Sequence, residues 1–258
     1  MPVALGRHAP RLAAVRALKT VKGRREQGRF AIEGATLLDE ALRAGLPIEA
    51  LYVTPAAYAA SRFVRELDER GTPTFAIDER TAAALSDVET PSGILAVAPV
   101  RREEVLAVLG RAGLVLVLAD LNDPGNAGTL VRSAEAFGAA GVVFGRAGVD
   151  PHHPKVVRAA MGSLFRMPVA VGDAGEMGRA TSALDVRAVG LVSGGSPLES
   201  GAWPTRCALV VGHERHGLGD WAAACDRLVA IPMQGSVESL NAAVAGSIAL
   251  YQAASRQS

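Results

Sequence analysis

The chain has 258 residues, 49% of them hydrophobic and 21% charged, and its two cysteines have neither Cys-x-x-Cys nor zinc-finger spacing. This composition is typical of a globular protein and excludes a disordered chain, a collagen-like repeat and a disulfide-held scaffold. No apolar run approaches the roughly 20 residues of a membrane helix, and the N-terminus lacks a secretory pattern. We therefore expect a cytoplasmic protein without a membrane segment, in which Cys207 and Cys225 are buried small hydrophobic residues.

The first 30 residues form the basic end of the chain. The net charge of the whole chain is +1, but residues 1–30 carry eight lysines and arginines against the single acid Glu26, so the remainder is net negative. Such a cluster can neutralise phosphates and give sequence-independent affinity for nucleic acid. The alternative is that these charges form an ordinary solvated helix face. Charge alone leaves both interpretations open.

Short β-like runs alternate with helical patterns from residue 29 onward, which predicts an α/β fold. Gly45 and Gly71 mark the ends of two predicted helices. A charged stretch at 101–104 precedes the strongest apolar run of the chain, so we place a domain boundary near residue 105. The first domain, 1–105, begins with the basic arm; its predicted strands are 29–33, 48–53, 74–77 and 94–98, and its predicted helices are 35–44, 59–70 and 79–85.

The second predicted domain, 106–258, repeats the alternation and forms a mainly parallel, doubly wound sheet. Ligands in such sheets bind outside the C-terminal ends of the strands, so the loops that follow strands are where chemistry is expected. The predicted strands are 114–119, 141–144, 168–171, 188–192, 208–211 and 228–231, and the predicted helices are 129–137, 155–164, 176–184 and 239–254.

The first polar loop, residues 120–128, follows the strongest strand and opens a helix whose free N–H groups suit an anion. It lacks the Gly-Lys-Ser/Thr of a Walker loop and the Gly-x-Gly-x-x-Gly of a dinucleotide site. Helical spacing places Leu130, Ala134 and Phe137 on one face and directs Arg132 away from it. Arg132 is thus available to a ligand, or is simply a solvated surface arginine.

Two further polar loops follow predicted strands of the same sheet. The second reads Gly212-His-Glu214-Arg-His-Gly217, and its glycines permit close approach of the backbone. The third runs from Ile231 to Asn241 and opens the last helix, where Ser236 or Ser239 is equally well read as an N-cap. Each loop alone is weak evidence, but three at the ends of one sheet point to a site.

Together, in this order and spacing, the three loops resemble the SpoU/TrmH family of RNA ribose 2′-O-methyltransferases. The resemblance rests on Asn126-x-Gly128-x-x-x-Arg132, Gly212-x-Glu214-x-x-Gly217, Ile-Pro-Met-x-Gly and Ser239-Leu240-Asn241. Residues 154–164 also look like a family segment, and residues 29–34 and 90–96 resemble a substrate-binding domain with a ribosomal-protein-like α/β fold. The chain departs from the family at Ala242-Ala243, where members often have Val-Ser, and at His213, to which we assign no role.

The resemblance implies S-adenosylmethionine as methyl donor, a deep trefoil knot in the C-terminal domain, and a homodimer whose active sites draw on both subunits. It implies that Arg132 contacts the 2′-hydroxyl and that Asn126, Glu214, Ser239 and Asn241 organise the site. The cofactor positions are Gly212, Ile231 and Leu240, with Ser193, Gly195 and Met233 expected close by. The residues expected to bind RNA are Arg24, Arg25, Arg29, Lys155 and Arg158.

The predicted function is therefore S-adenosylmethionine-dependent methylation of a ribose 2′-hydroxyl, with 23S rRNA as first choice of substrate. The alternatives are a tRNA ribose methyltransferase and a non-catalytic RNA-binding dimer. A nicotinamide dehydrogenase lacks its glycine fingerprint here, and the pair His152-His153 has no further clustered ligand, so no metal is expected.

The last predicted helix is expected to carry the dimer contact. Leu240, Val244, Ile248 and Tyr251 form an apolar stripe, which we expect to pack on the sheet of the same chain. Small residues lie beside it, and we expect them to admit a helix of the second subunit: Ala243, Gly246 and Ser247.

Overall fold

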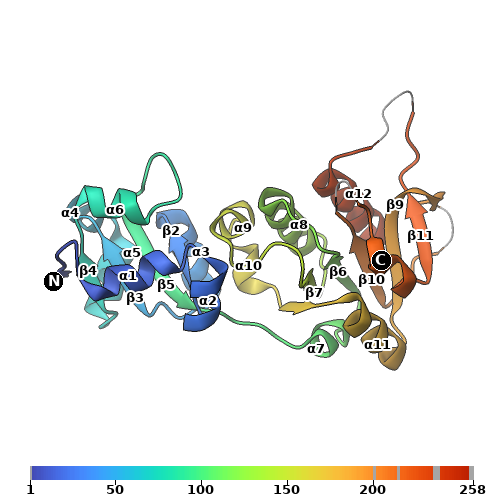
Figure 1. Ribbon diagram of the computed structural model, residues 1–258, viewed down its shortest axis with the longest axis horizontal. Helices are drawn as coiled ribbons and strands as arrows, with labels where there is room; N and C mark the ends of the chain where they lie inside the picture. Colours follow the sequence, from blue (N-terminus) through green and yellow to red (C-terminus); the bar gives the residue numbers. More distant parts are fainter. Residues whose placement is uncertain (1, 200–201, 214–215, 235–238, 256–258) are drawn as a thin grey trace. The chain divides into compact units, whose positions relative to one another are not determined.

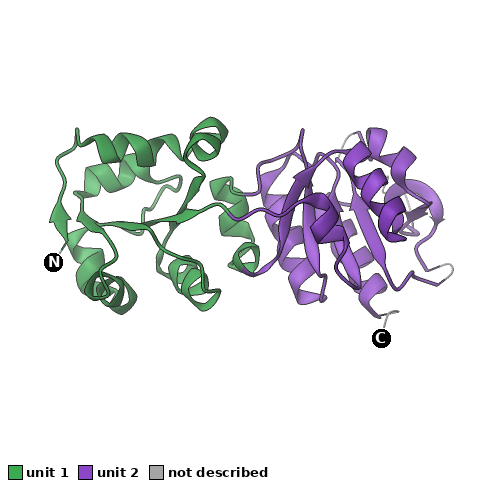
Figure 2. Cartoon of the chain, turned by 90° about the horizontal axis from the view of Figure 1, so that it is seen from below, with its two compact units in different colours: residues 1–100, 152–165 green, residues 101–151, 166–258 purple. Residues whose placement is uncertain are grey.

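The computed structural model describes residues 2–199, 202–213, 216–234 and 239–255. The chain forms two compact units (Figure 2): unit 1 comprises residues 1–100 and 152–165, and unit 2 comprises residues 101–151 and 166–258. The predicted domain boundary at residue 105 stays a prediction, and residues 152–165, which we expected in the second domain, cluster with unit 1. Within the described part of the chain, no helix is long and apolar enough to span a bilayer.

Unit 1 is built on a five-stranded mixed sheet of order β1-β4-β3-β5-β2 (Figure 1). The pairs β1/β4 and β4/β3 are parallel, and β5 runs antiparallel to both β3 and β2. The strands are β1 (Val3–Ala4), β2 (Arg29–Glu33), β3 (Ala50–Val53), β4 (Thr74–Ala76) and β5 (Ile94–Pro99). The helices are α1 (Pro10–Ala17), α2 (Val21–Gln27), α3 (Ala35–Arg43), α4 (Pro55–Ala60), α5 (Arg62–Glu69) and α6 (Glu79–Leu85), with α9 (Pro154–Ala159) and most of α10 (Ser163–Arg166).

The basic N-terminal arm is part of the fold of unit 1. Leu12, Val15 and Leu18 of the α1 region are buried in one hydrophobic cluster with side chains of β3, β4, β5 and α6. The arm is therefore helical and anchored in the core, a feature that its charge pattern did not indicate.

The predicted helix 59–70 is interrupted in the structure. Ser61 is extended, and its side chain accepts a hydrogen bond from the Val64 N–H, which starts α5. Two short helices, α4 and α5, therefore replace the single predicted one.

Unit 2 contains a six-stranded sheet of order β11-β9-β10-β6-β7-β8, in which every neighbouring pair is parallel. The prediction of a mainly parallel sheet is confirmed. Its strands are β6 (Leu114–Leu118), β7 (Gly141–Gly145), β8 (Val169–Gly172), β9 (Arg187–Pro197), β10 (Cys207–Val211) and β11 (Arg227–Ala230). Its helices are α7 (Val105–Leu109), α8 (Pro124–Ala136), α11 (Ala174–Leu184), the 3-10 helix η1 (Gly219–Ala224) and α12 (Ala242–Ser255).

Both faces of this sheet are covered, which explains why its strands read as continuous apolar runs. Val115 and Val117 of β6 pack in one cluster with α7, α11 and η1. On the other face, α8 and α12 pack against each other and against β6. Cys207 is buried, as predicted, whereas Cys225 is only half-buried. Burial raises the pKa of the Cys207 thiol to about 12 and that of the Cys225 thiol to about 11.

The packing of α12 is the reverse of the predicted one. Bulk at Gly246 has no room, since a Cβ there would lie 2.5 Å from Leu130 Cδ2, and Ser247 Oγ lies 2.7 Å from Ser133 Oγ of α8. The small residues therefore face α8 of their own chain. The apolar stripe is exposed instead: Leu240 (38%), Val244 (49%), Ile248 (40%) and Tyr251 (58%).

Candidate active site

The site lies at the C-terminal ends of β6 and β10, which are adjacent parallel strands at the centre of the sheet of unit 2. The chain continues from β6 to β7 on one side, while β10 pairs with β9 on the other. Strand order thus reverses between β6 and β10, and such a point leaves a crevice between the two following loops. The first and second motif loops start here, and the third follows β11 at the edge of the sheet.

The first motif loop leads into α8. The side chain of Asp123 caps the helix by accepting a hydrogen bond from the Asn126 N–H at 2.7 Å. Leu130 and Ala134 are fully buried, whereas Arg132 is exposed, as the helical spacing predicted. Within the described ranges, the guanidinium of Arg132 makes no hydrogen bond or ion pair with the protein, so its donors are available to a ligand.

Asn241 joins the third motif loop to the first. Its Nδ2 donates a hydrogen bond to Asn126 Oδ1 at 3.0 Å. Its Oδ1 accepts from the N–H groups of Ala243 at 2.9 Å and Val244 at 3.2 Å. Asn241 is therefore the N-cap of α12, the role that we had considered for Ser236 and Ser239; Ser236 lies outside the described residues. Two of the predicted catalytic side chains are thus held in direct contact.

A cavity of about 210 Å³ opens beside these loops, at the ends of β9 and β10 and along the segment after β11. Its walls are mostly apolar. A Cβ at Gly212 would lie 2.3 Å from the Gly217 carbonyl oxygen, so the second motif loop folds back closely on itself there. The residues that line the cavity are Leu191, Val192, Ser193, Val211, Gly212, His213, Gly217, Ile231, Met233, Ser239, Leu240, Ala242 and Ala245.

Most of the predicted cofactor residues line this cavity: Gly212, Ile231, Leu240, Ser193 and Met233. Gly195 is different, because a Cβ there would lie 2.8 Å from the Leu228 carbonyl oxygen, so this glycine packs β9 against β11. Glu214, a predicted catalytic residue, lies outside the described residues. The described lining contains no Asp, Glu, Lys or Arg, which suits an adenine ring and a thioether chain.

Sequence reasoning missed several lining residues. His213 received no role, and Leu191, Val192 and Val211 were assigned only to strands, yet all four line the cavity. Their signal was present in the sequence, because each stands at or just after the C-terminal end of an apolar run.

Across the described ranges, no three His, Cys, Asp or Glu side chains lie close enough together to form a metal site.

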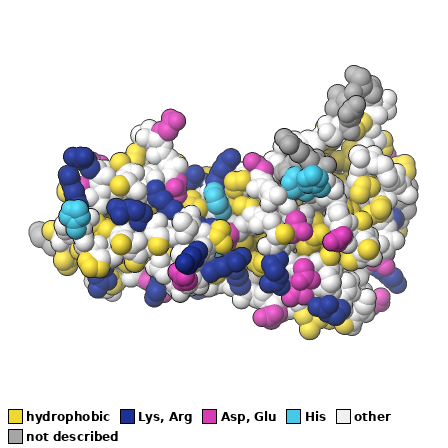
Figure 3. Space-filling model, in the orientation of Figure 1, with side chains coloured by type: hydrophobic (Ala, Val, Ile, Leu, Met, Phe, Trp, Pro, Cys, Tyr) yellow, Lys and Arg dark blue, Asp and Glu magenta, His cyan; other side chains and the backbone are white. Residues whose placement is uncertain are grey.

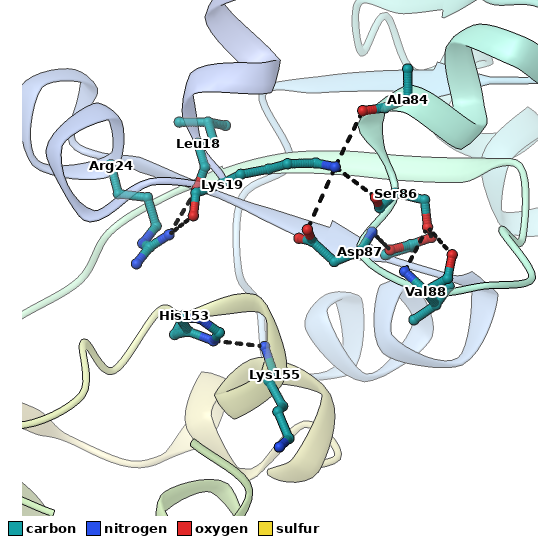
Figure 4. Close-up of polar contacts among 10 residues, drawn as sticks. Leu18, Lys19, Arg24, Ala84, Ser86, Asp87, Val88, His153 and Lys155 are labelled. Atoms are coloured by element: carbon teal, nitrogen blue, oxygen red, sulfur yellow. Dashed lines mark hydrogen bonds and ion pairs between the residues drawn. The ribbon is translucent and has the colours of Figure 1, made fainter. Parts of the chain in front are cut away.

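The predicted RNA-binding residues all belong to unit 1, but they differ in exposure. Arg25 and Lys155 are exposed and Arg158 is half-buried, while Arg29 is paired with Glu49. Figure 4 shows Lys155 beside His153, whose Nδ1 accepts a hydrogen bond from the Lys155 N–H at 3.1 Å. Figure 3 shows lysine and arginine side chains at several places on the visible face of unit 1.

Arg24 has a structural role. It is 2% exposed, and its Nη1 donates hydrogen bonds to the carbonyl oxygens of Leu18 at 2.9 Å and Lys19 at 3.0 Å (Figure 4). These bonds satisfy carbonyl groups at the end of α1, which a helix end leaves without intrahelical partners. The prediction that Arg24 contacts RNA was wrong, because its side chain is buried against the turn between α1 and α2. The local sequence does not reveal this burial.

Replacing Arg24 by methionine is expected to lower the free energy of unfolding by about 1.5–3 kcal/mol, the range for a hydrogen bond to a charged group. Thermal or urea unfolding measures this. The matched change Arg25→Met, one residue further along α2 and exposed, is expected to stay within about 0.5 kcal/mol of the parent. Equal stability of the two variants would contradict the structural role.

Comparison with known proteins identifies the family. Residues 113–251 match the model of the SpoU rRNA Methylase family, and residues 9–96 match the MRM3-like substrate binding domain. The chain belongs to the SpoU rRNA methylase family. A 23S rRNA (guanosine(2553)-2′-O)-methyltransferase of Bacillus subtilis is 32% identical over 238 residues, covering 91% of this chain and 92% of that protein. A 23S rRNA (uridine(2479)-2′-O)-methyltransferase of Streptomyces viridochromogenes is 31% identical, covering 89% and 84%.

Solved structures of SpoU methyltransferases have the same fold. The SpoU methyltransferase AviRb from Streptomyces viridochromogenes, in complex with the cofactor AdoMet, has a TM-score of 0.87 at 28% identity and covers 97% of this chain and 98% of that one. The AdoMet-bound rRNA methyltransferase from Sinorhizobium meliloti has a TM-score of 0.86 at 27% identity, covering 97% and 96%. The predicted α/β fold with a mainly parallel sheet is thereby confirmed, and the trefoil knot stays a prediction.

Proposed function

We propose that this protein transfers a methyl group from S-adenosylmethionine to a ribose 2′-hydroxyl of 23S rRNA. The observation that carries the proposal is the contact between Asn126 and Asn241, which joins two family motifs beside an apolar cavity. Arg132 extends from the same helix as Asn126, is exposed, and makes no hydrogen bond or ion pair within the described ranges. The family relatives named above act on 23S rRNA at ribose 2′-oxygens, which supports this choice of substrate.

S-adenosylmethionine supplies an electrophilic methyl group, so the task of the protein is to place and polarise the hydroxyl. The ribose oxygen forms a bond to the methyl carbon while the carbon–sulfur bond breaks, and the electron pair of that bond stays on sulfur. A guanidinium has donors and no acceptor, so the role of Arg132 is to stabilise the developing alkoxide. The proton leaves to water or to an RNA phosphate.

The other predicted side chains position the reactants. Asn126 and Asn241 hold α8 and the start of α12 in register through their shared hydrogen bond, which fixes where Arg132 projects. Ser239 lines the cavity, and we assign Glu214 to the same group of positioning residues. Gly212, Ile231, Leu240, Ser193 and Met233 would hold the donor through backbone and apolar contacts.

In this proposal, residues 1–105 form the RNA-binding domain and residues 106–258 the methyltransferase domain. Arg25, Arg29, Lys155 and Arg158 contact phosphates of the RNA. Arg25 and Lys155 suit this role because both are exposed. The match of residues 9–96 to a substrate binding domain supports the division.

Replacing Arg25, Lys155 and Arg158 together by alanine is expected to flatten the salt dependence of RNA binding. Each lost phosphate contact lowers the slope of log affinity against log salt by about 0.7–0.9, so the triple variant should lose about two. Filter binding or fluorescence anisotropy at several salt concentrations measures the slope. An unchanged slope would mean that these cations are solvated surface charges; the affinity for S-adenosylmethionine, measured in parallel, is the control.

We also propose that the protein acts in the cytoplasm as a homodimer and that its C-terminal domain contains the trefoil knot of its family. The support for a dimer is the exposed apolar stripe of Leu240, Val244, Ile248 and Tyr251, whose four members are each more than a third exposed. Large apolar side chains gathered on one helix face usually mark an interface. In a twofold homodimer the same surface patch of both subunits meets, so the partner that we propose for this stripe is a second copy of the chain.

Two measurements test the proposed function. Tritium transfer from labelled S-adenosylmethionine to 23S rRNA that lacks its ribose methylations should be catalytic, and nuclease digestion should recover the label on a 2′-oxygen. Calorimetry should show binding of S-adenosylmethionine in the absence of RNA. A protein that binds RNA but neither binds the donor nor transfers label would instead be an RNA-binding dimer, and transfer to tRNA alone would change the substrate.

A further inference from the structure

Asp120 occupies an unusual backbone position directly after β6. Its φ is +50°, in the left-handed region that residues other than glycine seldom adopt, although Asp and Asn tolerate it best. Such a conformation persists only where surrounding contacts enforce it, and it gathers at functional sites. Asp120 belongs to the first motif loop but to none of the family positions that the sequence singled out.

The carboxylate of Asp120 bridges two other loops. Its Oδ2 accepts a hydrogen bond from Trp221 Nε1 at 2.8 Å, and its Oδ1 accepts one from the Ala147 N–H at 3.1 Å. Trp221 is 3% exposed and lies on η1, which directly follows the second motif loop. Ala147 lies in the loop after β7.

Close backbone packing surrounds the same residue. A Cβ at Gly145 would lie 2.4 Å from both the Asp120 N and Oδ1 atoms, and one at Gly148 would lie 2.9 Å from the Asp120 carbonyl carbon. The Val149 N–H also donates to the Leu121 carbonyl oxygen at 2.9 Å. Two glycines thus allow the loop after β7 to press on the start of the first motif loop, which fixes its path before Asp123 caps α8.

These contacts form one chain of links across the site. Trp221 connects the segment after the second motif to Asp120, the loop from Asp120 to Asp123 sets the start of α8, and Asn126 of α8 is bound to Asn241 of the third motif. On the basis of the function proposed above, we infer that Asp120 is a positioning residue for methyl transfer: it holds the three motif loops in one arrangement and thereby aims α8 and its Arg132.

The decisive variants are Asp120→Asn and Asp120→Gly. Asparagine keeps the left-handed backbone but has one acceptor oxygen for two donors, and glycine keeps the backbone without any acceptor. Because small displacements of reacting groups cost up to about a hundred-fold in rate, both variants should lower kcat roughly ten- to hundred-fold, while affinity for S-adenosylmethionine changes less than about two-fold. Equal losses of kcat and of affinity for S-adenosylmethionine would mean that Asp120 maintains the shape of the donor cavity, and would overturn the inference.

Trp221→Phe provides the matched partner, since it keeps a buried ring and removes only the N–H donor. In the Trp221→Phe background the indole donor is gone, so the single amide oxygen introduced by Asp120→Asn needs to accept a hydrogen bond only from the Ala147 N–H. Asp120→Asn should therefore cost less there than in the parent chain, which a double-mutant cycle on kcat measures. Additive effects would contradict the link.

Hydrogen exchange separates this inference from the proposed function. Loss of the Asp120 contacts should speed amide exchange across residues 119–130 in a protein that still unfolds cooperatively, whether or not an RNA substrate is at hand. Unchanged exchange overturns the inference. If the parent protein transfers no methyl group to any RNA, the proposed function is contradicted. The comparison of amide exchange between the parent and the Asp120 variants then still decides the role of Asp120.

Discussion

Arg132→Ala is expected to lower methyl transfer to 23S rRNA by about a hundred- to a thousand-fold, the range for removing one donor that stabilises a developing oxyanion. The side chain is exposed on α8 and makes no hydrogen bond or ion pair within the described ranges, so its removal is expected to leave the fold intact. Tritium incorporation gives the rate, and the thermal midpoint, expected to stay within a few degrees, shows that the protein is folded.

Two control variants sharpen this test. Arg179→Ala removes an exposed arginine from α11 of the same unit and should leave both rate and stability unchanged. Arg132→Lys keeps the charge but loses the planar fork of donors, and should recover only a small part of the rate. Near-normal activity in folded Arg132→Ala would remove this residue from the proposed mechanism.

If the protein is the homodimer that we propose, the double variant Val244→Glu with Ile248→Glu is expected to be monomeric and to lose methyl transfer. Both side chains are exposed on the apolar stripe of α12, so the charges cost little in the monomer but would be buried unpaired in an interface. Sedimentation velocity gives the oligomeric state, and the same samples give the transfer rate.

The control for this variant is Leu106→Glu, which places a charge on an exposed apolar residue of α7, a helix packed in the core cluster on the other face of the sheet. It should leave the oligomeric state and the rate of methyl transfer unchanged. A parent protein that sediments as a monomer at concentrations where it is fully active would contradict the shared-site dimer. Gly246 is unsuitable for this purpose, because bulk there strikes Leu130 within the chain.

The sequence predicted most strands of both sheets because each is an apolar run bounded by turn residues. The strand 29–33 and the helix 79–85 have the predicted bounds, and α8 begins earlier than expected because Pro124 occupies its first turn after the Asp123 cap. Helices α1 and α2 were missed because their basic residues obscure a short apolar pattern, and the burial of α1 depends on contacts with β3 to β5 that local periodicity does not encode.

The parts of the candidate site that depend on helical spacing or on glycine geometry were predictable from the sequence. Helical spacing alone places Arg132 off the apolar face of α8, and the glycine pair Gly212 and Gly217 marks the point where the second motif loop folds closely on itself. The partner of Asn126 was not predictable, since 115 residues separate it from Asn241. The direction of the α12 stripe was also mistaken, because periodicity identifies two faces but not which one meets α8.

Mapping ribose methylations of 23S rRNA in a strain that lacks the gene tests the central claim most directly. The account predicts that one 2′-O-methyl group disappears, that the parent gene restores it, and that a gene carrying Arg132→Ala, expressed to the same level, does not. A complete set of 23S rRNA ribose methylations in the deletion strain, or full restoration by Arg132→Ala, would contradict it.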